Sequence, residues 1–263
     1  MQDRIRRRLE ELQADGTLRV VYACESGSRA WGFPSADSDF DVRFLYVRPL
    51  SWYLAVLPRR DVIEDLIDLD LDLGGWDLRK ALALLRRGNA PLIEWLSSPI
   101  VYHEDAAAVA PLRRLVEPAL LPETVCHHYL AQARRLLAGL EEGEEARLKV
   151  YLYVLRALLA ARWVIERGQA PPMNLWQLLD GVGSGPWPRE EIDELAERKR
   201  VSTETDRISR LPDLETALHC EQDELLDRVP KNSSSLPPER FDEAFLEALR
   251  AVGELPPDGA GDR

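Results

Sequence analysis

One stretch near the N-terminus, residues 22–47, restricts the fold more than any other part of this chain. An apolar run ends at residue 24, Gly27-Ser28 follows, and Asp39-Phe40-Asp41 opens a second apolar run. A Gly-Ser pair lets the backbone approach a phosphate closely at the start of a helix. Two carboxylates one residue apart on a strand share a face and can hold one divalent cation. The stretch therefore indicates a site for a nucleoside triphosphate and magnesium.

Each half of this pattern also has an ordinary interpretation. Gly-Ser alone is a common turn between a strand and a helix, and acids at a strand start are often exposed polar positions. The spacing of the two halves favours the functional interpretation. Ser28 is then expected to bind phosphate oxygen through its hydroxyl and backbone N–H. Arg29 is either a further phosphate ligand or a surface cation.

Composition narrows the class of protein. The chain has 263 residues, of which 45% are hydrophobic and 30% charged, as expected for a globular protein of one or two domains. No apolar run has the length of a transmembrane helix, and the N-terminus lacks a signal-peptide core, so we expect no membrane association. Cys24, Cys126 and Cys220 lie far apart. This favours reduced thiols in a cytoplasmic protein and excludes a zinc motif.

The net charge of −12 argues against a broad surface that coats nucleic acid. It is compatible with a small RNA end held by a local basic patch, because an enzyme that modifies a terminus needs few phosphate contacts.

Residues 62–75 combine acidic and apolar positions in alternation. The alternating positions are Ile67, Leu69, Leu71 and Leu73 on one side and Asp68, Asp70 and Asp72 on the other. This pattern predicts a strand with one apolar and one acidic face. The acidic face either lines a metal cleft opposite Asp39 and Asp41 or is the solvated face of an edge strand.

Asp77 immediately precedes a helical pattern formed by Leu78, Ala81, Leu82 and Leu85. This position favours an N-cap over a metal ligand for Asp77. Lys80 lies in the first turn of the same helix, where the helix dipole does not favour a cation. That mismatch indicates either an anionic ligand, such as a nucleotide phosphate, or simple exposure to solvent.

After residue 104 the pattern becomes helical, with no convincing strand. Helices are predicted over residues 105–117, 122–140, 144–167, 173–180, 189–200, 212–229 and 238–252. Lys149 and Tyr153 lie outside the apolar stripe of the strongest helix, 144–167. They either face the cleft and hold base or phosphate, or belong to a solvent-exposed face.

These patterns predict an α+β fold. A small mixed sheet flanked by helices, residues 1–103, would carry the metal site. An all-α domain, residues 104–253, would form the other wall of a cleft that holds the substrates. Residues 254–263 are expected to form a flexible tail.

The motifs resemble those of a known superfamily. Gly27-Ser28, ten residues and Asp39-Phe40-Asp41 are similar to the signature of DNA polymerase β-like nucleotidyltransferases. The longer segments at 26–33, 38–43, 75–80 and 94–96 look like the predicted nucleotidyltransferases associated with bacterial RNA repair. This resemblance is specific over about residues 18–103 and continues more weakly through 149–153 and 171–173.

The resemblance implies a polymerase β-like palm domain that moves a nucleoside monophosphate from an NTP, ATP being favoured, to an acceptor hydroxyl. Asp39 and Asp41 would bind Mg²⁺, or alternatively Mn²⁺, and a third carboxylate would complete a two-metal site. The family position before residues 75–80 assigns that carboxylate to Asp72, with Asp70 as second choice and Asp77 as a rival. The nucleotide-binding set would comprise Gly27, Ser28, Arg29, Lys80, Lys149 and Tyr153.

The resemblance further implies an RNA or tRNA end as the acceptor. Two other hypotheses remain open: transfer to a protein side chain or small-molecule hydroxyl, and an inactive module that only binds nucleotide or RNA. The intact Gly27, Ser28, Asp39 and Asp41 speak against the inactive module, because binding alone would not require a complete metal face.

Overall fold

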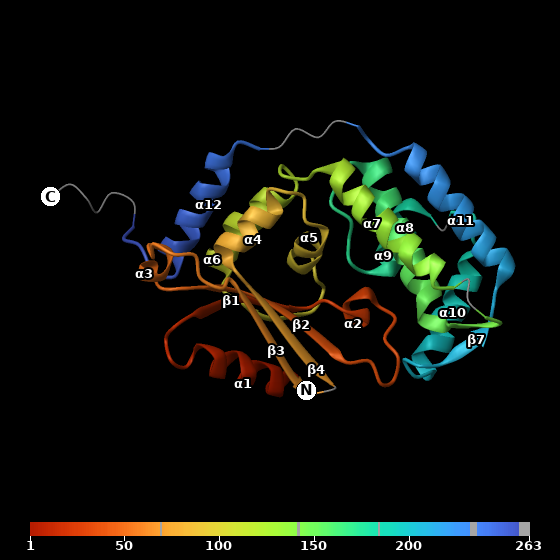
Figure 1. Cartoon of the computed structure of the whole chain (residues 1–263), viewed down its shortest axis with the longest axis horizontal. Coiled ribbons are helices and arrows are strands. Elements are labelled where there is room, and N and C mark those ends of the chain that lie inside the picture. The colour runs from red at the N-terminus through yellow and green to blue at the C-terminus, as the bar shows by residue number, and fades with distance from the viewer. Residues whose placement is uncertain (69, 141–142, 184, 232–235, 258–263) are drawn as a thin grey trace.

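A five-stranded mixed sheet forms the base of the molecule (Figure 1). The computed structural model describes residues 1–68, 70–140, 143–183, 185–231 and 236–257. The strand order is β3-β4-β2-β1-β5; β2 and β4 run parallel, and the other neighbours are antiparallel. The strands are β1 (Arg19–Glu25), β2 (Phe40–Val47), β3 (Val62–Asp68), β4 (Leu71–Asp77) and β5 (Val101–Glu104).

Helix α1 (Gln2–Gln13) covers one face of this sheet (Figure 1). Ile5 and Leu9, one helical turn apart, are buried against an apolar layer. The strand residues in that layer are Val20, Ala23, Val42, Phe44, Tyr46, Leu71 and Leu73. Because side chains alternate along a strand, the intervening residues of β2 and β4 project from the opposite face.

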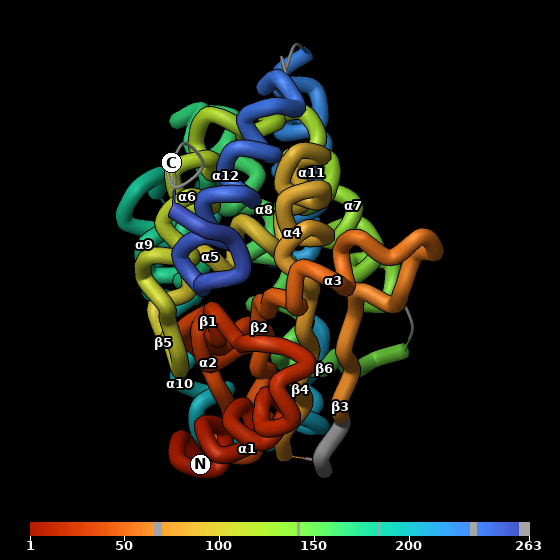
Figure 2. Tube along the Cα trace, turned by 90° about the vertical axis from the view of Figure 1, so that its left-hand side faces the viewer, coloured from red at the N-terminus to blue at the C-terminus, as the bar shows by residue number. Residues whose placement is uncertain are grey.

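That opposite face is covered by α4 (Leu78–Leu85), α5 (Ala90–Leu96), α6 (Ala106–Val116) and α12 (Pro238–Ala251). Helix α12, near the end of the chain, packs on α6 and α4, as Figure 2 shows from the side. Two single-turn helices, α2 (Ser28–Trp31) and α3 (Leu50–Tyr53), follow β1 and β2.

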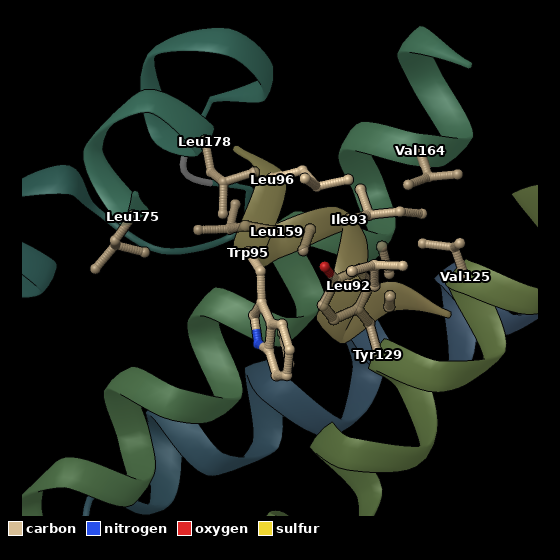
Figure 3. Packing of buried hydrophobic residues seen from close by; sticks show 14 of the residues in the cluster. Leu92, Ile93, Trp95, Leu96, Val125, Tyr129, Leu159, Val164, Leu175 and Leu178 are labelled. Atoms are coloured by element: carbon tan, nitrogen blue, oxygen red, sulfur yellow. The ribbon is translucent and has the colours of Figure 1, made fainter. Parts of the chain in front are cut away.

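The remaining helices form a bundle beside the sheet (Figure 1). They are α7 (Pro122–Ala138), α8 (Leu148–Arg167), α9 (Leu175–Val182), α10 (Arg189–Val201) and α11 (Pro212–Asp227). The apolar side chains of α5 pack into this bundle: Leu92 and Ile93 belong to one cluster with Tyr129 of α7 and Leu159 of α8 (Figure 3). One hydrophobic core therefore joins the sheet to the bundle.

The predicted α+β class is confirmed, and a helix overlaps each of the seven segments predicted after residue 104. The domain division at residue 104 stays a prediction. The predicted boundary between residues 103 and 104 falls within β5, and both β5 and the following helix α6 pack on β1. At the predicted tail, the Glu254 carboxylate accepts a hydrogen bond from the Leu50 backbone N–H at 2.8 Å. Residues 258–263 lie outside the described residues.

Two local predictions differ from the structure. The alternating segment 67–73 is not one strand, because β3 ends at Asp68 and pairs antiparallel with β4 from Leu71. A short hairpin connection preserves the alternation, so periodicity alone does not reveal it; Leu69 lies outside the described residues. In addition, β6 (Glu145–Arg147) pairs with β7 (Arg207–Ser209). Strands of three residues are too short to show a period.

In the part of the chain that the structure describes, no helix is both long and apolar enough to cross a bilayer. Cys24, Cys126 and Cys220 are all free thiols, and the first two are buried.

Candidate active site

The turn between β1 and α2 brings the backbone against a carboxylate. A Cβ atom added at Gly27 would lie 2.0 Å from Oδ2 of Asp41, far inside van der Waals contact. Glycine is therefore required at this position by the close approach of the β2 carboxylate. The Gly-Ser pair and the acidic strand are thus adjacent in space as well as in sequence.

A buried acid that the sequence reasoning missed holds this turn in place. Glu25, the last residue of β1, is completely buried. Its Oε1 accepts hydrogen bonds from the backbone N–H of Asp41 at 2.9 Å and of Gly27 at 3.4 Å. Its Oε2 accepts one from the Tyr102 hydroxyl at 2.6 Å. The signal in the sequence was the position of Glu25, an acid that ends an apolar strand two residues before Gly27.

The pairing of β2 with β4 places Asp41 directly opposite Asp72. Both side chains lie on the face opposite α1, since the next residues, Val42 and Leu73, pack against α1. The Arg43 guanidinium lies between the two carboxylates, with its Nη2 2.8 Å from Asp72 Oδ2 and 3.4 Å from Asp41 Oδ1. The register of a parallel strand pair therefore brings two distant acids together around one cation.

Burial, with the negative charge of Asp39 as the next largest cause, raises the pKa of Asp41 to about 6. The Arg43 cation opposes this shift, while Glu25 and Asp72 add to it. Asp39 itself is exposed, one residue before β2 begins. Several negatively charged side chains thus lie close together at the start of β2.

The donor set fits a hard divalent cation such as Mg²⁺, because every candidate ligand is a carboxylate oxygen. Arg43 already lies as a positive charge between two of these ligands. Among the described residues, no three His, Cys, Asp or Glu side chains are gathered closely enough to hold a metal as they stand.

The structure places the other two acids elsewhere. Asp70 is exposed in the turn that precedes β4. Asp77 is buried and caps α4: its Oδ1 accepts from the Arg79 N–H at 2.9 Å and its Oδ2 from the Tyr53 hydroxyl at 2.8 Å. It lies five residues along β4 from Asp72, a separation of roughly 16 Å. Its geometry is that of the predicted N-cap.

Ser28 and Arg29 both contact the segment that leads into Asp39. The buried Ser28 hydroxyl donates to Ser38 Oγ at 3.1 Å. Arg29 donates to the backbone carbonyls of Ser38 at 2.5 Å and Asp39 at 3.1 Å. Its guanidinium also lies 3.8 Å from the ring centre of Phe40. In this structure Arg29 therefore binds the loop between α2 and β2.

Lys149 and Tyr153, one turn apart on α8, both face this loop. Lys149 Nζ lies 2.8 Å from a carboxylate oxygen of Glu204. The Tyr153 ring meets Trp31 edge to face, with the ring centres 4.9 Å apart. Burial raises the pKa of Tyr153, and the charges of Glu204, Asp41 and Asp39 raise it further. Their position outside the apolar stripe thus corresponds to a face turned toward the acids.

Lys80 does not lie near Asp41 or the Gly27-Ser28 turn. It lies in the first turn of α4, beyond the Asp77 end of β4, and its Nζ is 3.1 Å from Asp61 Oδ1. The site built around Asp41 therefore contains five of the six predicted nucleotide-binding residues, all except Lys80.

A cavity of about 300 Å³ opens beside Asp72. Gly74 and the stacked rings of Trp76 and Trp95 line it, and the two ring centres are 3.9 Å apart. Arg43 also lines it. The cavity thus combines two aromatic rings, a residue without a side chain and the β4 acid that pairs with Asp41.

Comparison with known proteins decides the family. The model of the RNA repair pathway DNA polymerase beta family, RlaP, matches residues 1–249. The chain belongs to this family. A relative from Bacillus subtilis (strain 168), the uncharacterized protein YcgL, is 40% identical over 262 residues, which are 98% of this chain and 99% of that protein.

Among solved structures, a nucleotidyltransferase-like protein from Exiguobacterium sibiricum is similar to 96% of this chain and 78% of its own. The identity is 17% and the TM-score 0.32, a likeness too weak to transfer geometry or function. The RlaP match confirms the resemblance read from the Gly27-Ser28 and Asp39-Phe40-Asp41 motifs. It identifies the chain as a polymerase β-type nucleotidyltransferase.

Several residues at the site had no role assigned from the sequence. Arg43 lies in the motif segment 38–43 among apolar strand residues, and Lys199 and Glu204 lie in a highly charged segment that is typical of solvated surface. Their roles follow from partners contributed by distant elements.

Proposed function

We propose that this RlaP-family chain transfers a nucleoside monophosphate from an NTP, ATP being favoured, to a hydroxyl at an RNA or tRNA end. Pyrophosphate is the second product. The observation that supports this most is the pairing of Asp41 with Asp72 beside the Gly27-Ser28 turn. It combines a phosphate-binding turn with acids from two strands, as nucleotidyl transfer requires.

In the proposed reaction, the acceptor oxygen forms a bond with the α-phosphorus while the bond between that phosphorus and the pyrophosphate oxygen breaks. Asp72 orients the acceptor hydroxyl and receives its proton. Ser28 and the adjacent backbone N–H hold the phosphate chain. The Glu25 carboxylate holds the turn next to Asp41, because it accepts hydrogen bonds from the backbone N–H of Gly27 and of Asp41.

Asp39, Asp41 and Asp72 would hold Mg²⁺, or Mn²⁺ in its place. The bound metal would supply positive charge to the reacting oxygens and the leaving pyrophosphate. The positive charge of Arg43 compensates the negative charges of Asp41 and Asp72 in this structure. Movement of Arg43 away from these acids is therefore part of the proposal.

We assign the acceptor nucleoside to the cavity beside Asp72. An aromatic wall suits an unpaired base, because stacking on an aromatic side chain contributes about 1–3 kcal/mol per base. Trp76→Leu is expected to raise KM for the RNA acceptor several-fold and to leave the Kd for NTP unchanged. An unchanged acceptor KM would contradict this assignment while leaving the transfer reaction in place.

The deciding experiment is label transfer. Purified protein, Mg²⁺ and each α-³²P-labelled NTP are incubated with total cellular RNA and, separately, with total cellular protein. The double variant Asp39→Ala/Asp41→Ala is the control. Label on RNA with the unmutated protein alone supports the proposal and identifies the preferred nucleotide.

Two other outcomes support the rival hypotheses. Label on protein would favour transfer to a side chain, with the same chemistry. Binding of NTP without metal-dependent transfer to either pool would favour a small-molecule acceptor or an inactive binding module. We place the reaction in the cytoplasm, since all three cysteines are free thiols.

A further inference from the structure

A carboxylate of this chain lies inside a cluster of donors next to the proposed active site. Glu204 Oε1 accepts hydrogen bonds from Ser35 Oγ at 2.6 Å, Ser38 Oγ at 2.7 Å and Lys199 Nζ at 3.0 Å. Its Oε2 accepts one from Lys149 Nζ at 2.8 Å. Two hydroxyls and two ammonium groups therefore converge on one anion.

The donors are built into the protein rather than displayed on its surface. Lys199 is 1% exposed, and Ser35 and Ser38 are each 4% exposed. Lys199 also donates to Ser35 Oγ at 3.2 Å. A buried ammonium without a counter-ion is strongly destabilising. The cluster therefore requires an anion, whichever anion it is.

This anion pocket adjoins the predicted phosphate turn. The Ser28 hydroxyl donates to Ser38 Oγ at 3.1 Å, so the two sites share a hydrogen-bonded serine pair. Ser38 directly precedes Asp39 in the chain, and Arg29 donates to the Ser38 carbonyl. The anion pocket and the proposed phosphate turn are therefore contiguous.

Glu204 enters the pocket from a segment without regular structure, between the end of α10 at Val201 and the start of β7 at Arg207. Its backbone N–H donates to the Asp37 carboxylate at 2.9 Å. The Ser202 carbonyl accepts from the Ala36 N–H at 3.4 Å. The backbone of Glu204 belongs to no helix or strand. Withdrawal of this segment therefore breaks the loop contacts and the four hydrogen bonds of the Glu204 carboxylate, which an incoming anion has to replace.

Glu204 stays ionised at neutral pH. Burial alone would raise its pKa, but the hydrogen bonds from Lys149, Ser35, Ser38 and Lys199 outweigh burial and hold the pKa well below its ordinary value. Mild acidification therefore does not empty the pocket, and another anion has to displace the carboxylate.

We propose that the Glu204 carboxylate occupies the place of the terminal phosphate of the NTP, which displaces it and binds the same donors. Lys199, Ser35 and Ser38 thereby become phosphate ligands alongside Lys149. This inference rests on the proposed function, because it takes the nucleotide to bind at Ser28. Phosphate oxygens suit the pocket, since they accept charge-assisted hydrogen bonds from ammonium groups as a carboxylate does.

The first test compares the affinity of variants for a triphosphate and a monophosphate. Binding of an NTP analogue with a methylene group between its α- and β-phosphorus is measured by calorimetry with Mg²⁺. Glu204→Gln is expected to lower its Kd about tenfold, and Lys199→Met to raise it about tenfold. The Kd for the corresponding NMP should stay within about twofold in both variants, because an NMP does not reach the pocket.

Glu197→Gln is the matched control, since Glu197 pairs with Arg200 on the exposed side of α10. It should change neither affinity. An unchanged or higher Kd of the analogue with Glu204→Gln would overturn the inference, as would an equal gain for the NMP. If the unmutated chain and Glu204→Gln both bind no NTP, the proposed function falls as well.

A second test uses the unmutated chain and does not depend on the folding of a variant. Hydrogen exchange is measured over residues 202–206 with and without the NTP analogue. Displacement of Glu204 should release its N–H from Asp37 and speed exchange there. Slower exchange would show that the segment closes over the nucleotide with Glu204 in place, and would overturn the inference.

Discussion

At the scale of single residues, the closest fit in the site is that of Gly27 against Asp41. A methyl group at residue 27 would collide with the Asp41 carboxylate at 2.0 Å. Gly27→Ala should therefore lower the transfer rate by about 100-fold, since a displacement of about 1 Å in a catalytic group has a cost of this size. The rate is measured by label transfer to RNA and stability by thermal melting.

Gly139→Ala is the matched control for this prediction. Gly139 has ordinary right-handed backbone angles, and an added Cβ would meet its nearest neighbour at 3.4 Å. It should retain full activity. Retained activity in Gly27→Ala would contradict the placement of Asp41 against the turn.

Two lysines from the predicted nucleotide-binding set can be separated by substitution. Lys149 lies in the anion pocket next to the Gly27-Ser28 turn, whereas Lys80 pairs with Asp61 near the far end of β4. Lys149→Met should raise KM for the NTP about tenfold, because a charge-assisted hydrogen bond contributes about 1.5–3 kcal/mol. Lys80→Met should leave that KM unchanged. Steady-state kinetics decides, and a large effect of Lys80→Met would place the phosphates elsewhere.

At the scale of elements, the start of α4 carries a buried acid whose role the structure defines as a cap. Burial raises the pKa of Asp77 to about 6, although hydrogen bonds from Tyr53 and the Arg79 N–H oppose the shift. A raised pKa means that the folded state holds the proton more tightly than the unfolded chain does. Stability contributed by Asp77 therefore falls as pH rises from about 4 to about 6.

Asp77→Asn keeps a cap oxygen and removes the charge. The variant should match the unmutated chain near pH 4 and be more stable at pH 7.5. The gain has an upper limit of about 3 kcal/mol at 1.36 kcal/mol per pKa unit. Urea unfolding at both pH values measures it. A loss of stability at pH 7.5 would contradict the assignment of Asp77 as a helix cap that favours its protonated form. A loss of transfer activity would contradict its placement outside the active site.

At the scale of the whole molecule, one buried network connects the sheet half with the helical bundle. Glu94 of α5 accepts hydrogen bonds from Arg156 of α8 at 2.7 Å and from Tyr129 of α7 at 2.8 Å. The Arg156 guanidinium lies 4.5 Å from the ring centre of Trp31 in α2. The network thus reaches the helix that carries Ser28.

Glu94→Ala should destabilise the protein by about 3–5 kcal/mol, because it leaves the Arg156 charge buried without its partner. Glu243→Ala breaks an exposed pair with Arg240 and should cost less than about 1 kcal/mol. Denaturant unfolding compares the two. Glu94→Ala combined with Arg156→Met should cost less than the sum of the single changes; simple additivity would show that the pair does not act as a unit.

Local sequence patterns were sufficient for most elements and for the centre of the site. The helical periods predicted α6 to α12, and the spacing of Gly27-Ser28 and Asp39-Phe40-Asp41 predicted the turn and the acidic strand. These features are local because a hydrophobic period or a capping residue acts within a few positions. Asp77 could be assigned as an N-cap for the same reason.

Only the tertiary structure decided which distant charges meet. The register of β2 on β4 sets Asp41 against Asp72 with Arg43 between them. The packing of α8 and α10 beside the α2–β2 loop brings Lys149 and Lys199 to one carboxylate. A charged side chain has no period that identifies its partner, since an ion pair depends on distance in space. The sequence by itself therefore determined most of the elements, the family and the centre of the site, and the folded chain determined which distant residues join it.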